Sequence, residues 1–295
     1  MTAFSRGIVS GMNLFQGIVL VVITLVRAGR RLFGRDVMLY VGGVSFFALL
    51  AVFPAVAILI GIYGLFATPD QAAMQAEMVA RFMPVGAQDL FRHEVLRLSR
   101  VPIGTVSTQS ALAGLVGAYA AHRGFKALLA GLSFIHDEDK PQGFVRFNLL
   151  ALLVLIAAFA LLGLVSVAFL MVRVLANASG ISLLAGVSWL FSEWVWASLG
   201  LSLGLSLIYR YVMSSEPVAW PAALLGGAVA AALTLAASWA SGVYVNEIAH
   251  LGATYGSISA VVIFLIWVSW SVNAVFYGGA LATEVEIVLR KPSEA

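Results

Sequence analysis

One stretch near the C-terminus, residues 254–286, is long and apolar enough to cross a lipid bilayer as a single helix. On a helical wheel its polar side chains fall on one narrow face, and Val, Ile, Leu, Phe and Trp cover the other faces. A helix in lipid turns such a polar stripe toward protein or water. The stretch is therefore predicted to form the inner wall of a helical bundle. The polar stripe comprises Tyr255, Ser259, Ser269, Asn273, Tyr277 and Glu284.

The composition indicates a membrane protein. Of the 295 residues, 61% are hydrophobic and only 11% are charged, whereas a soluble domain is usually about one-quarter charged. Several apolar runs are long enough to span a bilayer. We therefore expect an all-α integral membrane helical bundle with about six transmembrane helices in one domain. The chain has no cysteine, which excludes disulfides, thiolate metal sites and a cysteine nucleophile.

The predicted transmembrane domain covers residues 37–286. It lies between a cytoplasmic N-terminal segment, 1–36, and a short cytoplasmic tail, 287–295. The first span contains Pro54, which is expected to kink its helix. The six predicted spans are 37–66, 104–121, 148–172, 189–211, 218–245 and 254–283.

Residues 8–26 have a different pattern from the spans. One helical face is apolar, and the opposite face leads to Arg27 and Arg31. This pattern is typical of an amphipathic helix lying in the membrane interface. We expect Arg27, Arg30 and Arg31 to contact lipid headgroups. The alternative is that 8–26 forms a seventh span.

The basic residues predict the orientation of the chain. The segments on the side of both termini hold twelve Lys and Arg residues, and those on the opposite side hold five. The positive-inside rule therefore places both termini in the cytoplasm.

The fourth and fifth spans carry small residues at helical spacing. Small side chains let helix backbones approach closely in membranes. We therefore expect both helices to pack tightly against the polar stripe of the last span, and the fifth to lie at the centre of the bundle. The packing positions are Gly200, Gly204, Gly226, Ala230 and Ser241.

A series of short motifs follows the order of the spans: Phe53-Pro54, Arg123 and Arg146, Tyr209-Arg210, Tyr255-Gly256-Ser257 and Trp267. In this order they resemble the YihY/BrkB family of bacterial inner-membrane proteins, some of which carried the older label ribonuclease BN. The resemblance runs from about residue 33 to residue 286. It implies a multi-pass inner-membrane protein associated with the cell envelope, for which transport or lipid handling is the usual suggestion.

The chain departs from the family pattern at three positions. Leu281 and Thr283 stand where the family commonly has Glu and Asn, and Met213 stands where a Pro usually follows Tyr-Arg. If the family's Glu has a function, this chain lacks it or uses Glu284 one turn later. A proton-relay role for the last helix is therefore disfavoured.

Two candidate sites lie within apolar runs. Glu193 is an ionisable residue inside such a run, and an ionisable residue within the membrane suggests a function. The alternative is that Glu193 lies at the depth of the lipid headgroups, where the neighbouring tryptophans are typically found and a charge costs little. Asn273 shares the stripe with Ser269 and Tyr277 and is predicted either to contact a substrate or ion or, as we prefer, to form an interhelical hydrogen bond.

Arg123 and Arg146 flank the predicted second and third spans on the cytoplasmic side. They are candidates to hold an anionic lipid headgroup or phosphate, and the alternative is that they only set topology. The His-Asp-Glu-Asp run at 136–139 resembles a metal-binding sequence, but adjacent loop residues rarely converge on one ion. We therefore predict no metal site and no cofactor.

Three functions are compatible with the family label. The first is transport or translocation of an amphipathic envelope component such as a lipid, with membrane lipids as partners. The second is a structural or assembly role without transport. The third, a ribonuclease, is disfavoured because the chain lacks clustered metal ligands, an acid–base pair and a basic patch for nucleic acid. We expect no enzymatic activity, and homo-oligomer formation stays open.

Overall fold

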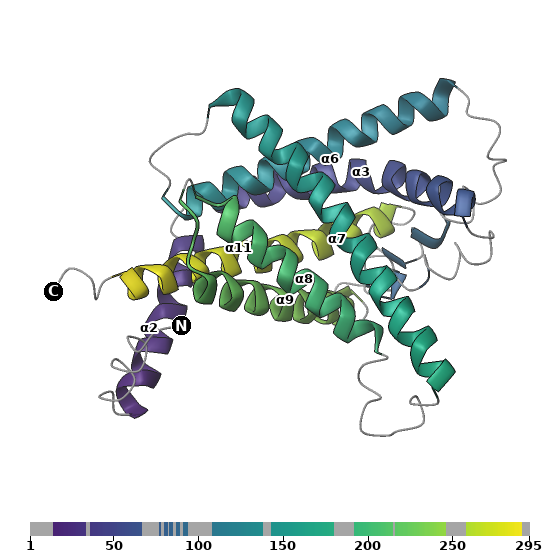
Figure 1. Cartoon of the computed structure of the whole chain (residues 1–295). Helices are drawn as coiled ribbons and strands as arrows, with labels where there is room; N and C mark the ends of the chain where they lie inside the picture. The colour runs from purple at the N-terminus through teal and green to yellow at the C-terminus, as the bar shows by residue number, and fades with distance from the viewer. Residues whose placement is uncertain are drawn as a thin grey trace.

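The computed structural model describes residues 14–33, 36–66, 108–137, 143–179, 192–214, 216–245 and 258–290, with isolated positions between 77 and 93. Within these residues the regular structure is helical and no strand is present, which confirms the predicted fold class. Figure 1 shows the long helices. They are α2 (Leu14–Phe33), α3 (Val37–Phe66), α6 (Thr108–Ile135), α7 (Phe144–Ser179), α8 (Glu193–Tyr211), α9 (Trp220–Val243) and α11 (Ser259–Arg290).

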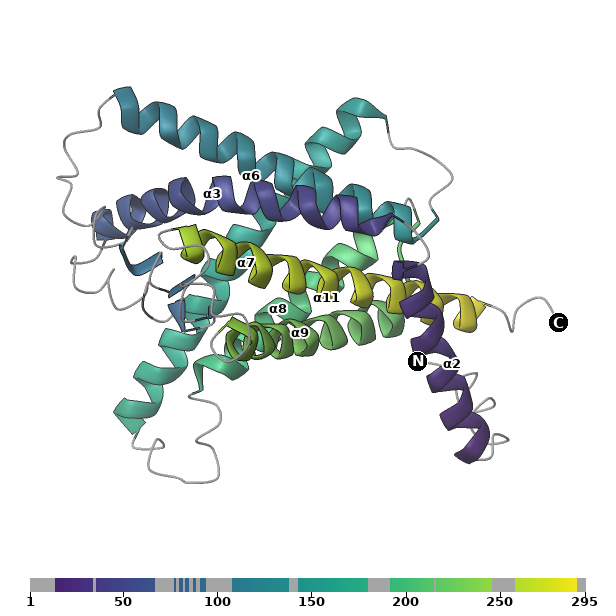
Figure 2. The ribbon, with the colours of Figure 1, turned by 180° about the vertical axis from the view of Figure 1, so that it is seen from behind.

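The last helix, α11, is the centre of the bundle. It packs against α9 on one side and against α3 and α2 on the other, with smaller contacts to α6 and α8. Both ribbon views show α6, α3, α11 and α9 stacked in that order with similar axis directions (Figures 1 and 2). The last span is therefore an inner helix, as predicted, whereas the fifth span, α9, was wrongly expected at the centre and lies with α8 to one side of α11 (Figures 1 and 2).

The α3–α6 pair is built on glycines that recur every seven residues. Gly117, Gly124 and Gly131 of α6 lie against Pro54, Phe47 and Tyr40 of α3 respectively, which also recur every seven residues. A Cβ atom at position 117 would lie 2.0 Å from Cβ of Pro54. A seven-residue repeat keeps one helix face turned toward its antiparallel partner. The glycines therefore set how closely these two helices approach.

The α9–α11 pair is built on small residues four positions apart. Gly226 and Ala230 of α9 meet Gly278 and Ala282 of α11, and a Cβ at Gly278 would lie 2.5 Å from Cβ of Ala230. The adjacent Gly227 faces Ser206 of α8. Such small-residue contacts are the usual basis of tight helix packing in membranes.

The other predicted packing positions lie at different contacts. Gly200 and Gly204 of α8 face Val165 and Leu161 of α7. Ser241 is fully buried in α9 and donates to the carbonyl of Ser238, 3.0 Å away. The polar stripe of α11, by contrast, faces α2 and α3 and not the small-residue face of α9.

Helix α7 lies at the edge of the bundle. It crosses the other helices obliquely (Figure 1) and packs against α6 and α8. Apolar side chains along most of its length are exposed, among them Leu149, Ile156, Leu164 and Val174. An apolar exposed surface of this extent is the one expected of a helix that faces lipid tails.

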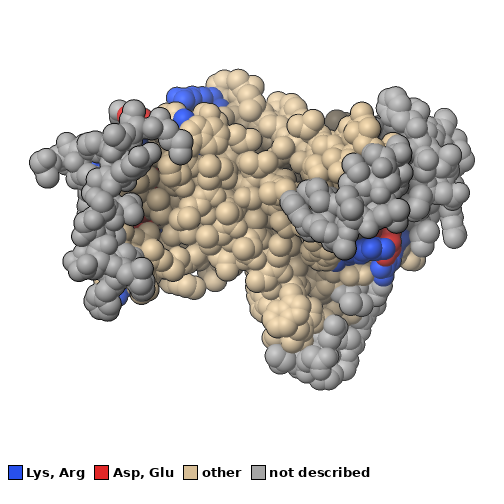
Figure 3. Space-filling view, turned by 60° about the horizontal axis from the view of Figure 1, so that its bottom comes forward, with Lys and Arg blue, Asp and Glu red and all other residues tan. Residues whose placement is uncertain are grey.

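Three described helical segments are long and apolar enough to cross a membrane: Val145–Val172, Trp220–Val243 and Ser259–Arg290. A fourth is added if Val19–Phe33 and Val37–Val52, which are bent by 72° relative to each other, form one broken span. In Figure 3 charged side chains lie toward the ends of the visible face, and its broad middle carries none. This distribution fits a band of lipid around the middle of the bundle.

Helix α6 is longer than the span predicted at 104–121. It continues to Ile135, through residues that the sequence interpretation assigned to a polar connection. His122, Arg123 and Lys126 are therefore helical residues well inside α6. The helix persists because this region contains good helix formers and no proline before residue 141.

Candidate functional site

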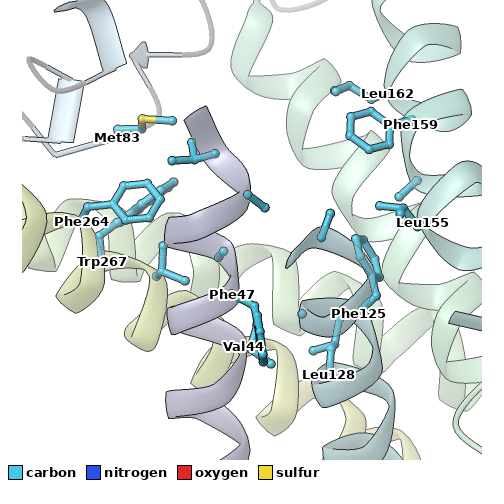
Figure 4. A pocket seen from close by; sticks show the side chains of 17 residues that line it. Val44, Phe47, Met83, Phe125, Leu128, Leu155, Phe159, Leu162, Phe264 and Trp267 are labelled. Carbon is cyan, nitrogen blue, oxygen red and sulfur yellow. The ribbon is translucent and has the colours of Figure 1, made fainter. Parts of the chain in front are cut away.

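An apolar cavity of about 480 Å³ lies between α3, α6, α7 and α11. Figure 4 shows its wall: Leu155, Phe159 and Leu162 of α7 lie on one side, Phe264 and Trp267 of α11 on the other, and α3 and α6 side chains between them. The surface of the cavity is almost entirely apolar. Its size is typical of a small-ligand pocket, and its lining suits hydrocarbon.

The sequence positions the cavity through side-chain size. Ala48 and Ala51 of α3, Ala121 and Gly124 of α6, and Ala158 of α7 leave space where larger residues would meet. The aromatic rings on α3, α6, α7 and α11 then form its walls. The alternation of small and aromatic side chains on facing helices therefore creates the cavity, and helical spacing within each helix places them on one face.

A cationic residue lies at the border of this cavity. The guanidinium carbon of Arg123 is 5.5 Å from the ring centroid of Phe47, which is itself part of the cavity wall. The Arg123 side chain is exposed. The face of an aromatic ring attracts a guanidinium group. The contact therefore holds the positive charge beside the apolar space.

A polar group joins α6 to α7 close to the cavity. Lys126 donates to Oδ1 of Asn148 at 2.8 Å, and Nε2 of His122 lies 3.4 Å from the same oxygen. The ammonium of Lys126 also lies 5.9 Å from the ring centroid of Phe147. Nδ1 of His122 is buried and has no hydrogen-bond partner among the described residues. We call His122, Lys126 and Asn148 the α6–α7 polar site.

The polar stripe of α11 makes interhelical contacts. The hydroxyl groups of Ser269 and Ser45 of α3 are 3.1 Å apart, and Tyr277 donates to the carbonyl of Leu25 of α2 at 3.2 Å. Asn273 instead donates to the carbonyl of Ser269, 2.8 Å away in its own helix, so the described contacts do not include the interhelical hydrogen bond that we preferred for Asn273. The contacts of Ser269 and Tyr277 join α11 to its neighbours.

A transport cavity built on the polar stripe would be lined by Asn273, Ser269, Tyr277 and residues of the fourth and fifth spans. The cavity described above is in a different place: Trp267 and Val268 of α11 line it, together with α3, α6 and α7. The difference arises because the stripe packs against α2 and α3. Sequence periodicity identified the polar face of α11 but contained no information about which helices would meet it.

Arg31 joins α2, α6 and α11 at one end of the bundle. Its Nε donates to Oε1 of Glu284 at 2.5 Å, and its Nη1 lies 2.5 Å from Oδ2 of Asp137. Nη1 also donates to the carbonyl of Ile135, the last residue of α6, at 3.2 Å. The expectation that Arg31 contacts headgroups is therefore corrected: the side chain turns inward because two carboxylates and a helix C-terminus attract it. Arg27 and Arg30 are exposed.

The remaining candidate residues are dispersed. Arg146 is exposed in the first turn of α7, and Glu193 is the first residue of α8, with its side chain outside the described part of the structure. Leu281 and Thr283, the departures from the family pattern, are both buried. Thr283 donates to the carbonyl of Gly279 at 3.0 Å, and its hydroxyl lies 2.9 Å from Nδ1 of His136.

The described residues contain no group of three or more His, Asp and Glu side chains placed to hold a metal ion. Of the run at 136–139, His136 contacts Thr283 and Asp137 pairs with Arg31. Glu138 and Asp139 lie outside the described residues, as does the segment 254–257 with Tyr255.

Sequence reasoning missed two features of this region. The α6–α7 polar site was missed because His122 and Lys126 were assigned to a loop, although their i,i+4 spacing places them on one helix face. The glycine repeat of α6 was also visible in the sequence as Gly117, Gly124 and Gly131.

Comparison with protein families links the chain to one of them. The model described as "Virulence factor BrkB" matches residues 28–294, nearly the whole chain. No curated protein and no solved structure matches the chain. The family match and the apolar helices together indicate a membrane protein with transmembrane helices. This chain belongs to the BrkB family.

Proposed function

We propose that this protein holds the acyl chain of a membrane lipid in the apolar cavity and moves that lipid between the two leaflets. The observation that carries the proposal is the cavity itself, about 480 Å³ with almost no polar surface. An apolar ligand is the only chemical class that such a wall binds without leaving polar groups unpaired. The exposed apolar surface of α7, which forms one wall, gives lipid tails access from the bilayer.

We also propose that the protein is a multi-pass protein of the bacterial inner membrane with both termini in the cytoplasm. The support is the excess of Lys and Arg on the side of the termini, twelve residues against five. The angle of 72° between the helical segments Val19–Phe33 and Val37–Val52 supports an N-terminal helix that lies along the membrane surface. On this orientation Arg31, Asp137 and Glu284 lie at the cytoplasmic end.

Translocation is tested with vesicles that contain the purified protein and a trace of fluorescent phospholipid in both leaflets. A membrane-impermeant reductant added outside destroys the label in the outer leaflet. Wild-type protein should expose the inner-leaflet label as well, so that the fluorescence falls below the level reached with empty vesicles.

Two variants of α7 make the test specific. Ala158→Phe fills the cavity that Ala158 lines, whereas Ala157→Phe adds the same side chain on the exposed face of α7. Only Ala158→Phe should slow the loss of inner-leaflet label. Equal rates for wild type, both variants and empty vesicles would favour the structural or assembly role.

A further inference from the structure

The α6–α7 polar site and the apolar cavity lie along the same face of α7. Asn148 precedes Leu155 by seven residues, which corresponds to about 10 Å along a helix, and seven residues are close to two full turns. Leu155 and, seven residues further, Leu162 line the cavity. One face of α7 therefore begins with a polar group and continues as hydrocarbon, in the order found in a phospholipid molecule.

The charged residues of the two helices that form the polar site are all positive. Helices α6 and α7 contain Arg123, Lys126 and Arg146 and have no Asp or Glu in either sequence. Lys126 is half-buried and bonded to Asn148. Arg123 lies over Phe47 at the cavity wall. An anionic group between these cations would gain charge-assisted hydrogen bonds.

His122 adds a preference for a hydrogen-bond donor. Lys126 can only donate, so the atom of Asn148 that it contacts is an acceptor oxygen, and Nε2 of His122 must donate to that same oxygen. In the neutral ring, Nδ1 is then an acceptor. It is buried without a hydrogen-bond partner among the described residues, so a ligand hydroxyl would satisfy it.

We propose that the α6–α7 polar site binds the headgroup of an anionic phospholipid that carries a free hydroxyl, as phosphatidylglycerol does, while an acyl chain of the same molecule fills the apolar cavity. The phosphate lies between Lys126 and Arg123, and the hydroxyl donates to Nδ1 of His122. This inference rests on the proposed function and adds the class of lipid.

The test measures binding of defined lipids to the purified full-length protein in detergent by native mass spectrometry. Phosphatidylglycerol is compared with phosphatidylcholine, which is zwitterionic, and with phosphatidylmethanol, which is anionic but has no headgroup hydroxyl; all three carry the same acyl chains. We expect phosphatidylglycerol to bind about tenfold more tightly than phosphatidylcholine, because Lys126 and Arg123 repel the choline ammonium, whereas phosphatidylglycerol brings only the negative charge of its phosphate. Equal binding of these two lipids would overturn the proposal.

Variants assign the preference to named groups. Lys126→Gln should remove most of the preference for phosphatidylglycerol over phosphatidylcholine, and Lys126→Arg should keep that preference. Arg81→Gln removes the same charge from an exposed position between α3 and α6 and should leave these preferences unchanged. His122→Phe should remove the preference over phosphatidylmethanol, about fivefold for one neutral hydrogen bond. If Lys126→Gln still prefers phosphatidylglycerol to phosphatidylcholine as strongly as wild type, the headgroup site is overturned. If His122→Phe still prefers phosphatidylglycerol to phosphatidylmethanol, the role of the hydroxyl is overturned.

Two further measurements separate this inference from the proposed function. Ala158→Phe should weaken the binding of all three lipids by the same factor, so that the ratios of their affinities do not change. If it does so while Lys126→Gln leaves the ratios intact, the headgroup site fails and the cavity stands. If Ala158→Phe weakens none of the lipids, the proposed function fails. Glycerol 3-phosphate alone should not displace phosphatidylglycerol; complete displacement would show a site for a free phosphate.

Discussion

The guanidinium of Arg31 on α2 contacts the carboxylate of Glu284 on α11, two residues that are 253 positions apart in the chain. The side chains of Arg31 and Glu284 are only 18% and 8% exposed. Arg31 also forms an ion pair with Asp137 and donates a hydrogen bond to the carbonyl of Ile135. Helix α2 is thereby fixed to the end of α6 and to the central helix at the same point.

Removal of Glu284 should loosen this attachment. Glu284→Gln leaves the mostly buried guanidinium without one of its charge partners, and we expect a loss of about 2 kcal/mol in stability, typical of hydrogen bonds to charged groups. Hydrogen exchange in α2 should rise, because Arg31 joins that helix to the bundle. Thermal unfolding in detergent and exchange mass spectrometry measure the two effects.

A double-mutant cycle isolates the Arg31–Glu284 interaction. The double variant Arg31→Gln/Glu284→Gln should be less destabilised than the sum of the two single changes. Arg30→Gln serves as the charge control on the same helix, at an exposed position. Additive losses would show that the two residues contribute independently.

The glycine repeat of α6 predicts a strong difference between two neighbouring glycines. Gly117→Ala places a Cβ 2.0 Å from Cβ of Pro54, whereas a Cβ at Gly114, one turn earlier, has no atom within 4 Å. We expect Gly117→Ala to destabilise the protein by about 2 kcal/mol through overpacking. Gly114→Ala should be neutral or stabilising, because alanine favours helix.

Melting temperatures of these two variants in the same detergent decide the point. If Gly117→Ala has the same melting temperature as Gly114→Ala and wild type, α3 and α6 do not approach as closely as described.

A pH effect is expected at the partly exposed pair of Glu77 and Arg92. Two hydrogen bonds from Arg92, of 2.6 and 2.9 Å, lower the pKa of the Glu77 carboxyl below its ordinary value, and the nearby charges of Arg92 and Arg81 act in the same direction. A lowered pKa in the folded state means that the pair stabilises the fold above the unfolded-state pKa. That contribution is lost as the pH falls through the folded-state pKa.

The carboxyl carbon resonance of Glu77, identified by its absence in Glu77→Gln, reports this titration by nuclear magnetic resonance of glutamate-labelled protein. Its midpoint should lie below that of a free glutamate and should return to the ordinary value in Arg92→Gln. An unchanged midpoint in Arg92→Gln would assign the shift to another group.

The sequence contained most of what defines the helices and little of what defines their neighbours. The wheel of α11 placed Ser269, Tyr277 and Glu284 on one face, and all three make contacts with α2 or α3. Helical spacing is a local property, so the face could be predicted. The identity of the partner helix depends on contacts between distant segments, and the stripe was wrongly paired with the fourth and fifth spans.

The candidate site shows the same division. Arg123 was singled out from the sequence and lies at the cavity wall, over Phe47. The cavity itself could not be predicted, because it depends on where small residues such as Ala48 and Ala158 meet across three or more helices. The α6–α7 polar site became visible only when α6 was found to continue past residue 121.

The central claim is that the apolar cavity holds a lipid acyl chain, and a photoreactive phospholipid tests it most directly. A phospholipid with a diazirine on one acyl chain is incorporated with the protein, irradiated and mapped by peptide mass spectrometry. We predict cross-links to the cavity wall, at Phe125, Leu155 and Trp267, that are lost in Ala158→Phe and kept in Ala157→Phe. Cross-links confined to the exposed faces of α7, with the same pattern in both variants, would contradict the claim.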